Sequence, residues 1–310
     1  MNSFLFAFET VFPLCAMLML GFLAQRLRWI QETSVRQMNQ VCFYLFLPMS
    51  LFSSVYHSSW ENISWKLILF ALGLVLLSFL LVLWIIQRTS MENVRKGVVV
   101  QGTFRSNFIL FGLPLTISFF GEQHAGTTAI LIAFIIPLYN VLSILVLQGY
   151  GNSKCSGITL LKKTCSNPLI IGAVCAFICV VCNVKLLKPI EVSVEMIADS
   201  ATPLALFLLG ASFVCAKVRH NLHVLMLVSI GKLLLLPGCV VGLAWWFGFR
   251  QEALIALLAM SASPTAVSSF TMAQSMNMDH ELAGQIVVFT TLFSILSLFL
   301  WISFMRMIGV

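Results

Sequence analysis

Residues 95–121 read RKGVVVQGTFRSNFILFGLPLTISFFG, a stretch long and apolar enough to cross a bilayer. It nevertheless carries Arg105 and Asn107 near its middle, followed by Gly112 and Pro114. Proline has no backbone N–H and its ring clashes with a preceding carbonyl, so we expect the helix to break at Gly112 and Pro114. Broken backbone and polar groups are tolerated at membrane depth only where they are buried in protein or line a cavity. The stretch therefore predicts an interrupted membrane helix beside a cavity.

A counterpart lies half a chain later. Residues 254–276 begin as an apolar run and reach Ser263, Pro264 and Thr265 near their middle. Two interrupted helices at corresponding places in two halves of a chain are typical of the substrate site of a secondary transporter. We therefore expect the two interruptions to meet near the middle of the membrane.

The composition identifies the class of protein. Of the 310 residues, 60% are hydrophobic and 9% are charged, and the mean hydropathy is +1.00. A soluble domain carries about 25% charged residues, so we expect an all-α protein that crosses the membrane many times. The net charge of +7 does not indicate a nucleic-acid partner, because the basic residues lie mostly in short loops between apolar runs.

Ten apolar segments, each near the roughly 20 residues that span a bilayer, divide the chain into two halves. The longest polar stretch lies at the midpoint, so we expect five helices in residues 1–148, a central cytoplasmic loop at 149–166, and five helices in residues 167–310. The ten expected segments are Ser3–Gln25, Met38–Val55, Ser64–Gln87, Gly97–Phe120, Ala125–Gln148, Asn167–Val184, Val194–Cys215, Leu222–Phe247, Gln251–Ser275 and Ala283–Ile308.

The two halves match at three places with nearly one offset, which indicates an internal duplication. The matches are Pro13-Leu14 with Pro168-Leu169, Pro48 with Pro203, and Leu138 with Leu292, at offsets of 155, 155 and 154 residues. With five spans in each copy, the second copy enters the membrane from the opposite side. The repeats are therefore predicted to be inverted, an arrangement that supports alternating access.

The loop charges predict the orientation in a cell membrane. The odd-numbered loops carry 11 Lys and Arg residues, whereas the even-numbered loops and the C-terminus carry 5. Cytoplasmic loops are enriched in these residues, so we expect the odd loops to be cytoplasmic and both termini to be extracytoplasmic. The two remaining basic residues, Arg105 and Lys232, lie inside the predicted membrane segments.

The sequence resembles the auxin efflux carrier family, which holds the plant auxin exporters and bacterial permeases for malonate, malate and similar acids. The resemblance covers nearly the whole chain and rests on Arg105-Ser-Asn107-Phe-Ile-Leu-Phe-Gly112-Leu-Pro114-Leu, Lys232-Leu-Leu-Leu-Leu-Pro237, Pro264 in its serine-rich helix, and Asn167-Pro168-Leu. It implies two inverted five-helix repeats whose fourth and ninth helices cross at Pro114 and Pro264 beside the substrate. It also implies a scaffold (helices 1, 2, 6 and 7) and a moving transport part (helices 3–5 and 8–10) with elevator-like movement. We also expect a homodimer.

The polar residues at the expected crossing could bind a carboxylate. A broken helix leaves N–H groups without partners and a partial positive charge at the N-terminus of each half, which suits an anion. Asn107 can donate or accept, and Ser263 and Thr265 supply hydroxyls. The resemblance also places an asparagine near the site, at Asn140, whose alternative role is a hydrogen bond between helices. The alternative role for Asn107, Ser263 and Thr265 is that they only satisfy backbone groups freed at the two prolines.

The two basic residues within the membrane are expected to be functional or paired, because an embedded charge costs at least ~2.5–3.5 kcal/mol on insertion scales. Lys232 is predicted to contact substrate or to form a salt bridge with Asp199 or Glu9. For Arg105, substrate contact and a structural role remain open. About 200° of helical turn separates Arg105 from Asn107, so we expect them not to share one face.

These observations predict a secondary carrier of small organic anions that works by alternating access, with H+ or Na+ as a possible coupling ion. A sodium-coupled symporter of the bile-acid type is the alternative, weakened because neither interrupted segment contains a carboxylate. A membrane sensor is a further alternative, but it would lack a soluble signalling domain. We expect no enzymatic activity, no catalytic residue, no metal site and no cofactor.

Overall fold

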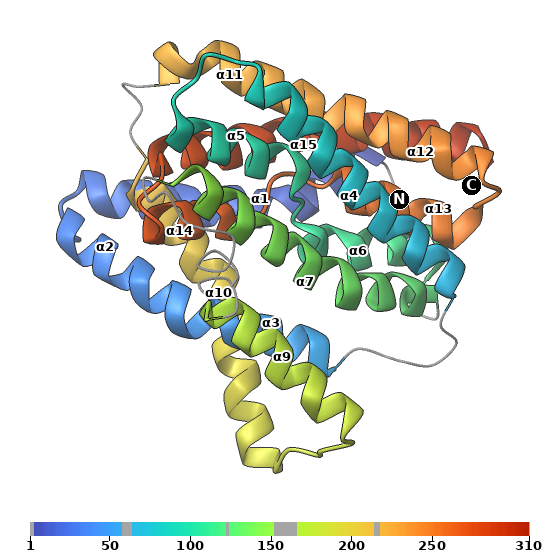
Figure 1. Cartoon of the computed structure of the whole chain (residues 1–310), viewed down its shortest axis with the longest axis horizontal. Helices are drawn as coiled ribbons and strands as arrows, with labels where there is room; N and C mark the ends of the chain where they lie inside the picture. The colour runs from blue at the N-terminus through green and yellow to red at the C-terminus, as the bar shows by residue number, and fades with distance from the viewer. Residues whose placement is uncertain (1–2, 58–63, 122–123, 152–165, 214–217, 310) are drawn as a thin grey trace.

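The computed structural model describes the chain except for residues 1–2, 58–63, 122–123, 152–165, 214–217 and 310 (Figure 1). The described residues form helices, with no strand among them. In chain order the elements are α1 (Ser3–Arg26), α2 (Glu32–Val41), the π-helical η1 (Cys42–Phe46), α3 (Leu47–Tyr56), α4 (Trp65–Gln87), α5 (Asn93–Phe104), α6 (Phe108–Phe120), α7 (Ala125–Tyr150), α9 (Pro168–Val181), α10 (Lys188–Ala211), α11 (Val218–Ile230), the π-helical η4 (Gly231–Leu235), α12 (Leu236–Trp246), α13 (Gln251–Ala262), α14 (Ser268–Ser275) and α15 (His280–Met307). Most of the expected central loop at 149–166 lies outside the described residues.

The prediction of an all-α membrane protein is confirmed. Within the described parts of the chain, seven continuous helical stretches are long and apolar enough to cross a membrane. They coincide with seven of the ten predicted segments. The other three are α9, with 14 residues, and the two segments that are divided into α5 and α6 and into α13 and α14. The two stretches expected to be interrupted are therefore interrupted, and neither forms a full-length helix.

The first interruption lies at residues 105–107, and the prediction of a break at Gly112 and Pro114 is wrong. α6 runs without interruption through both residues. Pro114 removes one helical hydrogen bond, and the hydroxyl of Thr116 donates to the carbonyl of Gly112 at 3.0 Å. One missing bond is not enough to end this helix, because its remaining backbone groups keep their partners. The second interruption lies at residues 263–267, between α13 and α14, and contains Pro264.

Gly112 serves close packing instead. A Cβ atom built there would lie 2.7 Å from the ring of Phe108 and 3.1 Å from a side-chain carbon of Thr128 on α7. A Cβ at this position would therefore displace the Phe108 ring within α6 and crowd Thr128 on α7. The glycine that resembled a helix breaker therefore permits two helices to approach.

Two glycine contacts join α1 to α10. A Cβ at Gly21 would lie 1.9 Å from the carbonyl oxygen of Phe207, and one at Gly210 would lie 2.0 Å from that of Leu18. A third contact joins α9 to α3, where a Cβ at Gly172 would lie 2.7 Å from the carbonyl oxygen of Pro48. Such close backbone approach is typical of small residues between membrane helices. In Figure 1, α2, α3, α9 and α10 lie together, apart from α4, α11 and α12.

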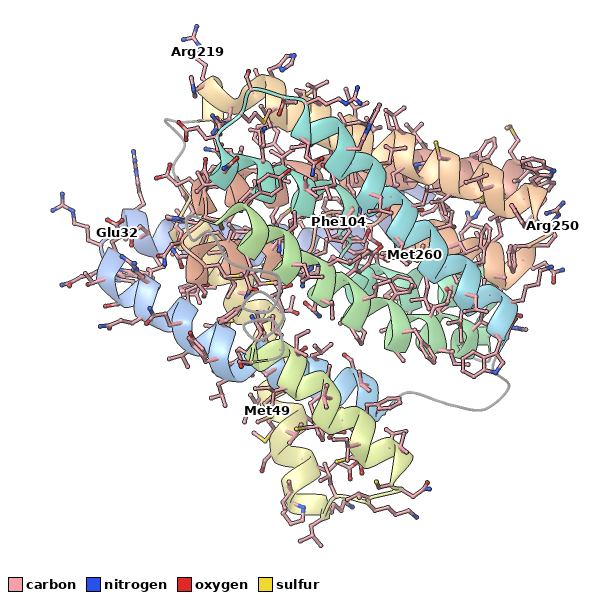
Figure 2. All side chains as sticks on the ribbon, in the orientation of Figure 1. Glu32, Met49, Phe104, Arg219, Arg250 and Met260 are labelled. Carbon is pink, nitrogen blue, oxygen red and sulfur yellow. The ribbon has the colours of Figure 1, made fainter. Side chains whose placement is uncertain are left out.

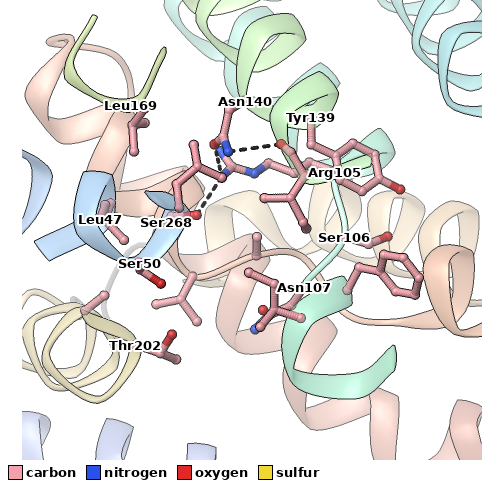
Figure 3. Close-up of a pocket in the computed structure, with 17 residues that line it drawn as sticks. Leu47, Ser50, Arg105, Ser106, Asn107, Tyr139, Asn140, Leu169, Thr202 and Ser268 are labelled. Carbon is pink, nitrogen blue, oxygen red and sulfur yellow. Dashed lines mark hydrogen bonds between the residues drawn. The ribbon is translucent and has the colours of Figure 1, made fainter. Parts of the chain in front are cut away.

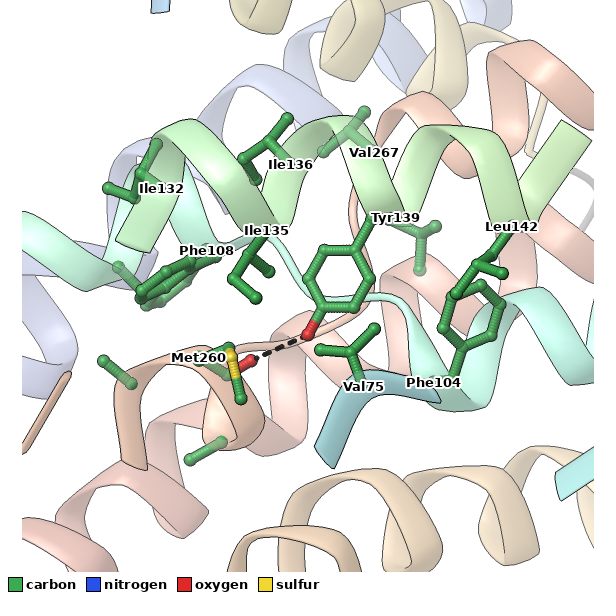
Figure 4. Close-up of a cluster of buried hydrophobic side chains, with 14 of the residues drawn as sticks. Val75, Phe104, Phe108, Ile132, Ile135, Ile136, Tyr139, Leu142, Met260 and Val267 are labelled. Atoms are coloured by element: carbon green, nitrogen blue, oxygen red, sulfur yellow. Dashed lines mark hydrogen bonds between the residues drawn. The ribbon is translucent and has the colours of Figure 1, made fainter. Parts of the chain in front are cut away.

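The apolar interior lies around the first interruption. Phe104 and Phe108, on either side of it, are completely buried and pack near Tyr139 and Met260 (Figure 4). The rings of Phe104 and Tyr139 have centroids 5.9 Å apart. Figure 2 shows the opposite distribution for charged groups, with Glu32, Arg219 and Arg250 at the periphery. The packing therefore anchors both ends of the break in a rigid core.

Candidate functional site

The two interruptions cross and supply hydrogen-bond partners to each other. The backbone N–H of Asn107 donates to the carbonyl of Pro264 at 2.8 Å. The Thr265 hydroxyl donates to the carbonyl of Gly102 at 2.6 Å, and its N–H donates to the Thr290 hydroxyl at 3.2 Å. Backbone groups that would be orphaned inside a membrane are thereby satisfied. These cross-contacts explain why α5 ends at Phe104 and why no proline is needed there.

A cavity of about 70 Å³ lies at the crossing (Figure 3). It is formed by the 105–107 turn, the start of α6, α7, the end of the second interruption with the start of α14, and residues of α3, α9 and α10. Its polar lining residues are Ser50, Arg105, Ser106, Asn107, Tyr139, Asn140, Thr202 and Ser268. The cavity therefore collects polar groups from elements far apart in the sequence.

Arg105 supplies the positive charge of this cavity. Its side chain is buried and donates to the side-chain amide oxygen (Oδ1) of Asn140 and to the Ser268 hydroxyl, both at 2.7 Å, and contacts the sulfur of Met272. None of the ion pairs formed between described residues includes Arg105. A guanidinium has five N–H donors, so these three contacts leave donors for a further acceptor.

The expectation that Arg105 and Asn107 cannot share a face is wrong. Both line the same cavity, because α5 ends at Phe104 and the two residues lie in a non-helical turn. Asn107 occupies the N-cap position of α6, and its side chain makes no capping hydrogen bond. The first residues of α6, Phe108 and Ile109, also line the cavity. The cavity thus adjoins the positive end of a half-helix as well as Arg105.

Lys232 lies behind the crossing and does not line the cavity. It is completely buried in η4, donates a hydrogen bond to the Ser106 hydroxyl, and lies 3.4 Å from the carbonyl oxygen of Phe104. The hypothesis of a salt bridge with Asp199 or Glu9 is wrong for this structure, since Asp199 is exposed on α10 and no described ion pair includes Lys232. Lys232 instead holds the turn that presents Arg105.

The other predicted residues fall into two groups. Asn140 lines the cavity, and its amide also donates to the carbonyl of Ile136 at 3.0 Å. Ser263 and Thr265 lie outside the lining, and their hydroxyls donate to the backbone carbonyls of Ala259 and Gly102. The structure thus gives these two hydroxyls the backbone-satisfying role that was the alternative. The rings of Pro114 and Pro264 do not line the cavity either.

Five polar lining residues were missed by the sequence analysis, among them Ser106, which lies between the predicted Arg105 and Asn107. Tyr139 lies next to Asn140, and its hydroxyl lies 3.4 Å from the carbonyl oxygen of Met260. Ser268 belongs to the serine-rich segment that follows Pro264. Ser50 and Thr202 come from α3 and α10. Each lies within two residues of the repeated prolines at 48 and 203, so the internal duplication was the signal that could have found them.

A larger cavity of about 780 Å³ adjoins this one and shares Ser50, Ile109 and Thr202 with it. It also contains Glu195 and Asp199. At its edge His57 Nε2 lies 3.0 Å from a carboxylate oxygen of Glu191 and 3.3 Å from one of Glu195. The crossing cavity therefore adjoins a larger cavity through which a small molecule could reach it. The charged residues lining that larger cavity are Glu195 and Asp199, with no Lys or Arg among the described residues of its lining.

Comparisons with known proteins identify the family of this chain. A family model described as "Membrane transport protein" matches residues 6–150 and 152–302, which confirms the resemblance to the auxin efflux carrier family. An uncharacterized transporter of Methanothermobacter thermautotrophicus is 22% identical over 299 residues, covering 94% of this chain and 96% of that protein. An uncharacterized transporter of Methanocaldococcus jannaschii is 20% identical over 311 residues, covering 94% and 97%.

Proposed function

Because this chain belongs to the membrane transport protein family and is a membrane transporter rather than an enzyme, we propose that it carries a small organic anion. The observation that supports this substrate class is Arg105, a buried cation that lines the crossing cavity and has no described carboxylate partner. Mono- and dicarboxylates and auxin-like acids are the proposed substrates.

The electrostatics favour an anion over a neutral or cationic substrate. An embedded charge costs at least ~2.5–3.5 kcal/mol, and an anion that pairs with Arg105 would offset this cost. Guanidinium and carboxylate match as a planar, two-bond pair. The N-terminus of α6 adds partial positive charge at the same cavity, and Asn107 adds an amide. A volume of about 70 Å³ favours a small substrate group at this point.

We further propose ten membrane helices in two inverted repeats, residues 1–148 and 167–310, joined by a central loop at 149–166. The glycine contacts support this arrangement, since they join α1 to α10 and α9 to α3. An inverted duplication exchanges helix 1 with 6 and helix 2 with 7. Here helix 1 is α1, helix 2 contains α3, helix 6 is α9 and helix 7 is α10. The exchange would therefore turn the contact of α1 with α10 into the contact of α9 with α3.

The proposed mechanism is alternating access of an elevator type. The cavity lies between Ser50 and Thr202, on the proposed scaffold, and Arg105 and Asn107, on the proposed transport part. Sliding of one part along the other would carry the bound anion across the membrane. Glu195 and Asp199 in the adjoining cavity are candidates for handling a coupling H+ or Na+. A homodimer with extracytoplasmic termini in a cell membrane completes the proposal.

The test is a flux assay on purified protein in liposomes, with a panel of mono- and dicarboxylates in the presence and absence of sodium and pH gradients. We expect saturable uptake of at least one acid, and we expect Arg105→Gln to reduce it by about thirtyfold or more, since breaking a buried charged pair costs ~2–5 kcal/mol. Arg219→Gln, on an exposed residue of α11, is the matched control. Unchanged uptake by Arg105→Gln would place the anion elsewhere.

A further inference from the structure

A second cavity, independent of the crossing, lies between α4, α5 and the continuous helix formed by α11, η4 and α12. Its volume is about 490 Å³. The walls are almost entirely aliphatic, and Leu77, Leu81, Leu227 and Leu235 on them are each more than half exposed. This space, hereafter the α4/α12 groove, therefore opens toward the membrane and not into the protein.

The shape of the groove suits a hydrocarbon chain. The residues of α4 and its following turn that line it run from Leu74 to Thr89, which corresponds to a length of ~22 Å at 1.5 Å per residue. One leaflet of a bilayer supplies ~15 Å of hydrocarbon. Water would find almost no hydrogen-bond partner on these walls. The groove therefore has room for an acyl chain along its length.

Positive charge gathers at one end of the groove. Arg88 follows α4, next to the lining residue Thr89, with its guanidinium carbon 3.9 Å from the ring centre of Trp84. Lys96 on α5 donates to the carbonyl of Gln87 at 3.3 Å. Residues 88–96 also contain Glu92 and Arg95, and Arg95 is paired with Asp279 at 3.5 Å, so Arg88 and Lys96 are the cations of this rim. An anionic group at this rim would be complementary in charge.

We propose that the α4/α12 groove binds an anionic phospholipid, with an acyl chain along the aliphatic walls and the phosphate at Arg88 and Lys96. Basic sites beside membrane helices are a known chemistry for such headgroups. The lipid would also contact Val99 and Thr103 of α5, which directly precede the Arg105 turn. The bound lipid would therefore support, from the membrane side, the helix that presents the substrate site. This inference does not depend on which anion is carried.

The first test fills the groove from within. A Cβ at Gly231, which lines the groove, meets no atom within 4 Å, and the same is true at Gly242, an exposed glycine of α12 outside the lining. Purified protein would be equilibrated with an equal mixture of phosphatidylglycerol and phosphatidylcholine, and retained lipid measured by native mass spectrometry. We expect wild type and Gly242→Leu to retain phosphatidylglycerol, and Gly231→Leu to lose about nine-tenths of it.

The second test needs no variant. Cys239 lines the groove and is a free, exposed cysteine, whereas the exposed Cys175 lies on α9, which contributes no residue to the groove lining. We expect phosphatidylglycerol to slow modification of Cys239 by N-ethylmaleimide at least about fivefold relative to phosphatidylcholine. Modification of Cys175 should be unaffected. Equal rates at Cys239 in the two lipids would overturn the proposed preference for an anionic headgroup.

The headgroup contact is tested by the double variant Arg88→Gln/Lys96→Gln. Each basic side chain near an anionic lipid contributes a factor of about five, so the preference for phosphatidylglycerol should fall by roughly tenfold or more. Lys185→Gln/Lys188→Gln removes the same amount of charge from exposed residues outside the groove and should leave the preference for phosphatidylglycerol unchanged.

If Gly231→Leu instead dissociates a dimer and leaves the lipid content unchanged, the groove holds a second copy of the chain and the proposal fails.

Discussion

At the scale of single residues, Arg105 and Lys232 have different surroundings although both are buried cations. Arg105 lines the cavity and has donors left for a further acceptor, whereas Lys232 bonds the Ser106 hydroxyl and the Phe104 carbonyl on either side of Arg105. The first arrangement is suited to binding and the second to positioning. Substitution of Arg105 should therefore mainly reduce substrate binding, whereas substitution of Lys232 should reduce stability as well as transport.

Asn107→Ala should weaken substrate binding and leave the fold intact. The Asn107 N–H that bonds Pro264 belongs to the backbone and survives the substitution. The lost amide is expected to raise the Kd of the transported anion by about tenfold, equivalent to one hydrogen bond to a charged group. Ligand-dependent thermal shift and liposome flux would measure this. If both are unchanged, the Asn107 side chain does not contact the transported anion.

Lys232→Met should reduce stability and flux together, because the Ser106 hydroxyl and the Phe104 carbonyl lose a charged donor. Hydrogen bonds to charged groups contribute about 1.5–3 kcal/mol, and Lys232→Arg should retain part of this. Ser106→Ala should produce a smaller loss of the same kind in thermal unfolding.

The double variant Lys232→Met/Asp199→Asn should be no more stable than Lys232→Met alone, because the two side chains are not paired in this structure. Recovery of stability in the double variant would mean that Lys232 and Asp199 form a buried pair in another conformation. The same thermal-unfolding series measures both outcomes.

At the scale of helices, the contact of α1 with α10 depends on glycine. Gly210→Ala would put a Cβ 2.0 Å from the carbonyl oxygen of Leu18, which the two backbones can relieve only by separating. We expect a loss of about 1–3 kcal/mol, the usual cost of overpacking. Gly242→Ala, where a Cβ meets nothing, should be neutral or stabilising by up to about 1 kcal/mol. Thermal unfolding of the two variants tests this, and equal stability would contradict it.

At the scale of the whole molecule, the loop charges predict the orientation. Because the odd loops carry 11 basic residues against 5 elsewhere, a reporter fused after Val310 that is active only outside the cytoplasm should be active. A reporter in the 149–166 loop should be inactive. The reverse pattern would invert the proposed topology and move the rim at Arg88 and Lys96 to the other leaflet.

The sequence alone determined the membrane class, the helical architecture and the family. The class and the architecture follow from composition, from apolar runs of spanning length and from polar residues inside two of those runs, all of which are local features. The family follows from the resemblance of short motifs in their order along the chain. It also singled out Arg105 and Asn107, because polar groups at membrane depth are costly enough to require a reason, whereas Asn140 came from the family resemblance.

Only the tertiary structure decided where the first helix breaks and which polar groups share the cavity. The sequence suggested Gly112 and Pro114, but the break lies at residues 105–107, where the second interruption supplies a carbonyl partner. Ser50 and Thr202 reach the cavity from other helices, and Lys232 finds Ser106 rather than Asp199. A buried backbone or polar group is stabilised by whichever partner lies beside it in space, and partners that are far apart along the chain leave no local mark in the sequence.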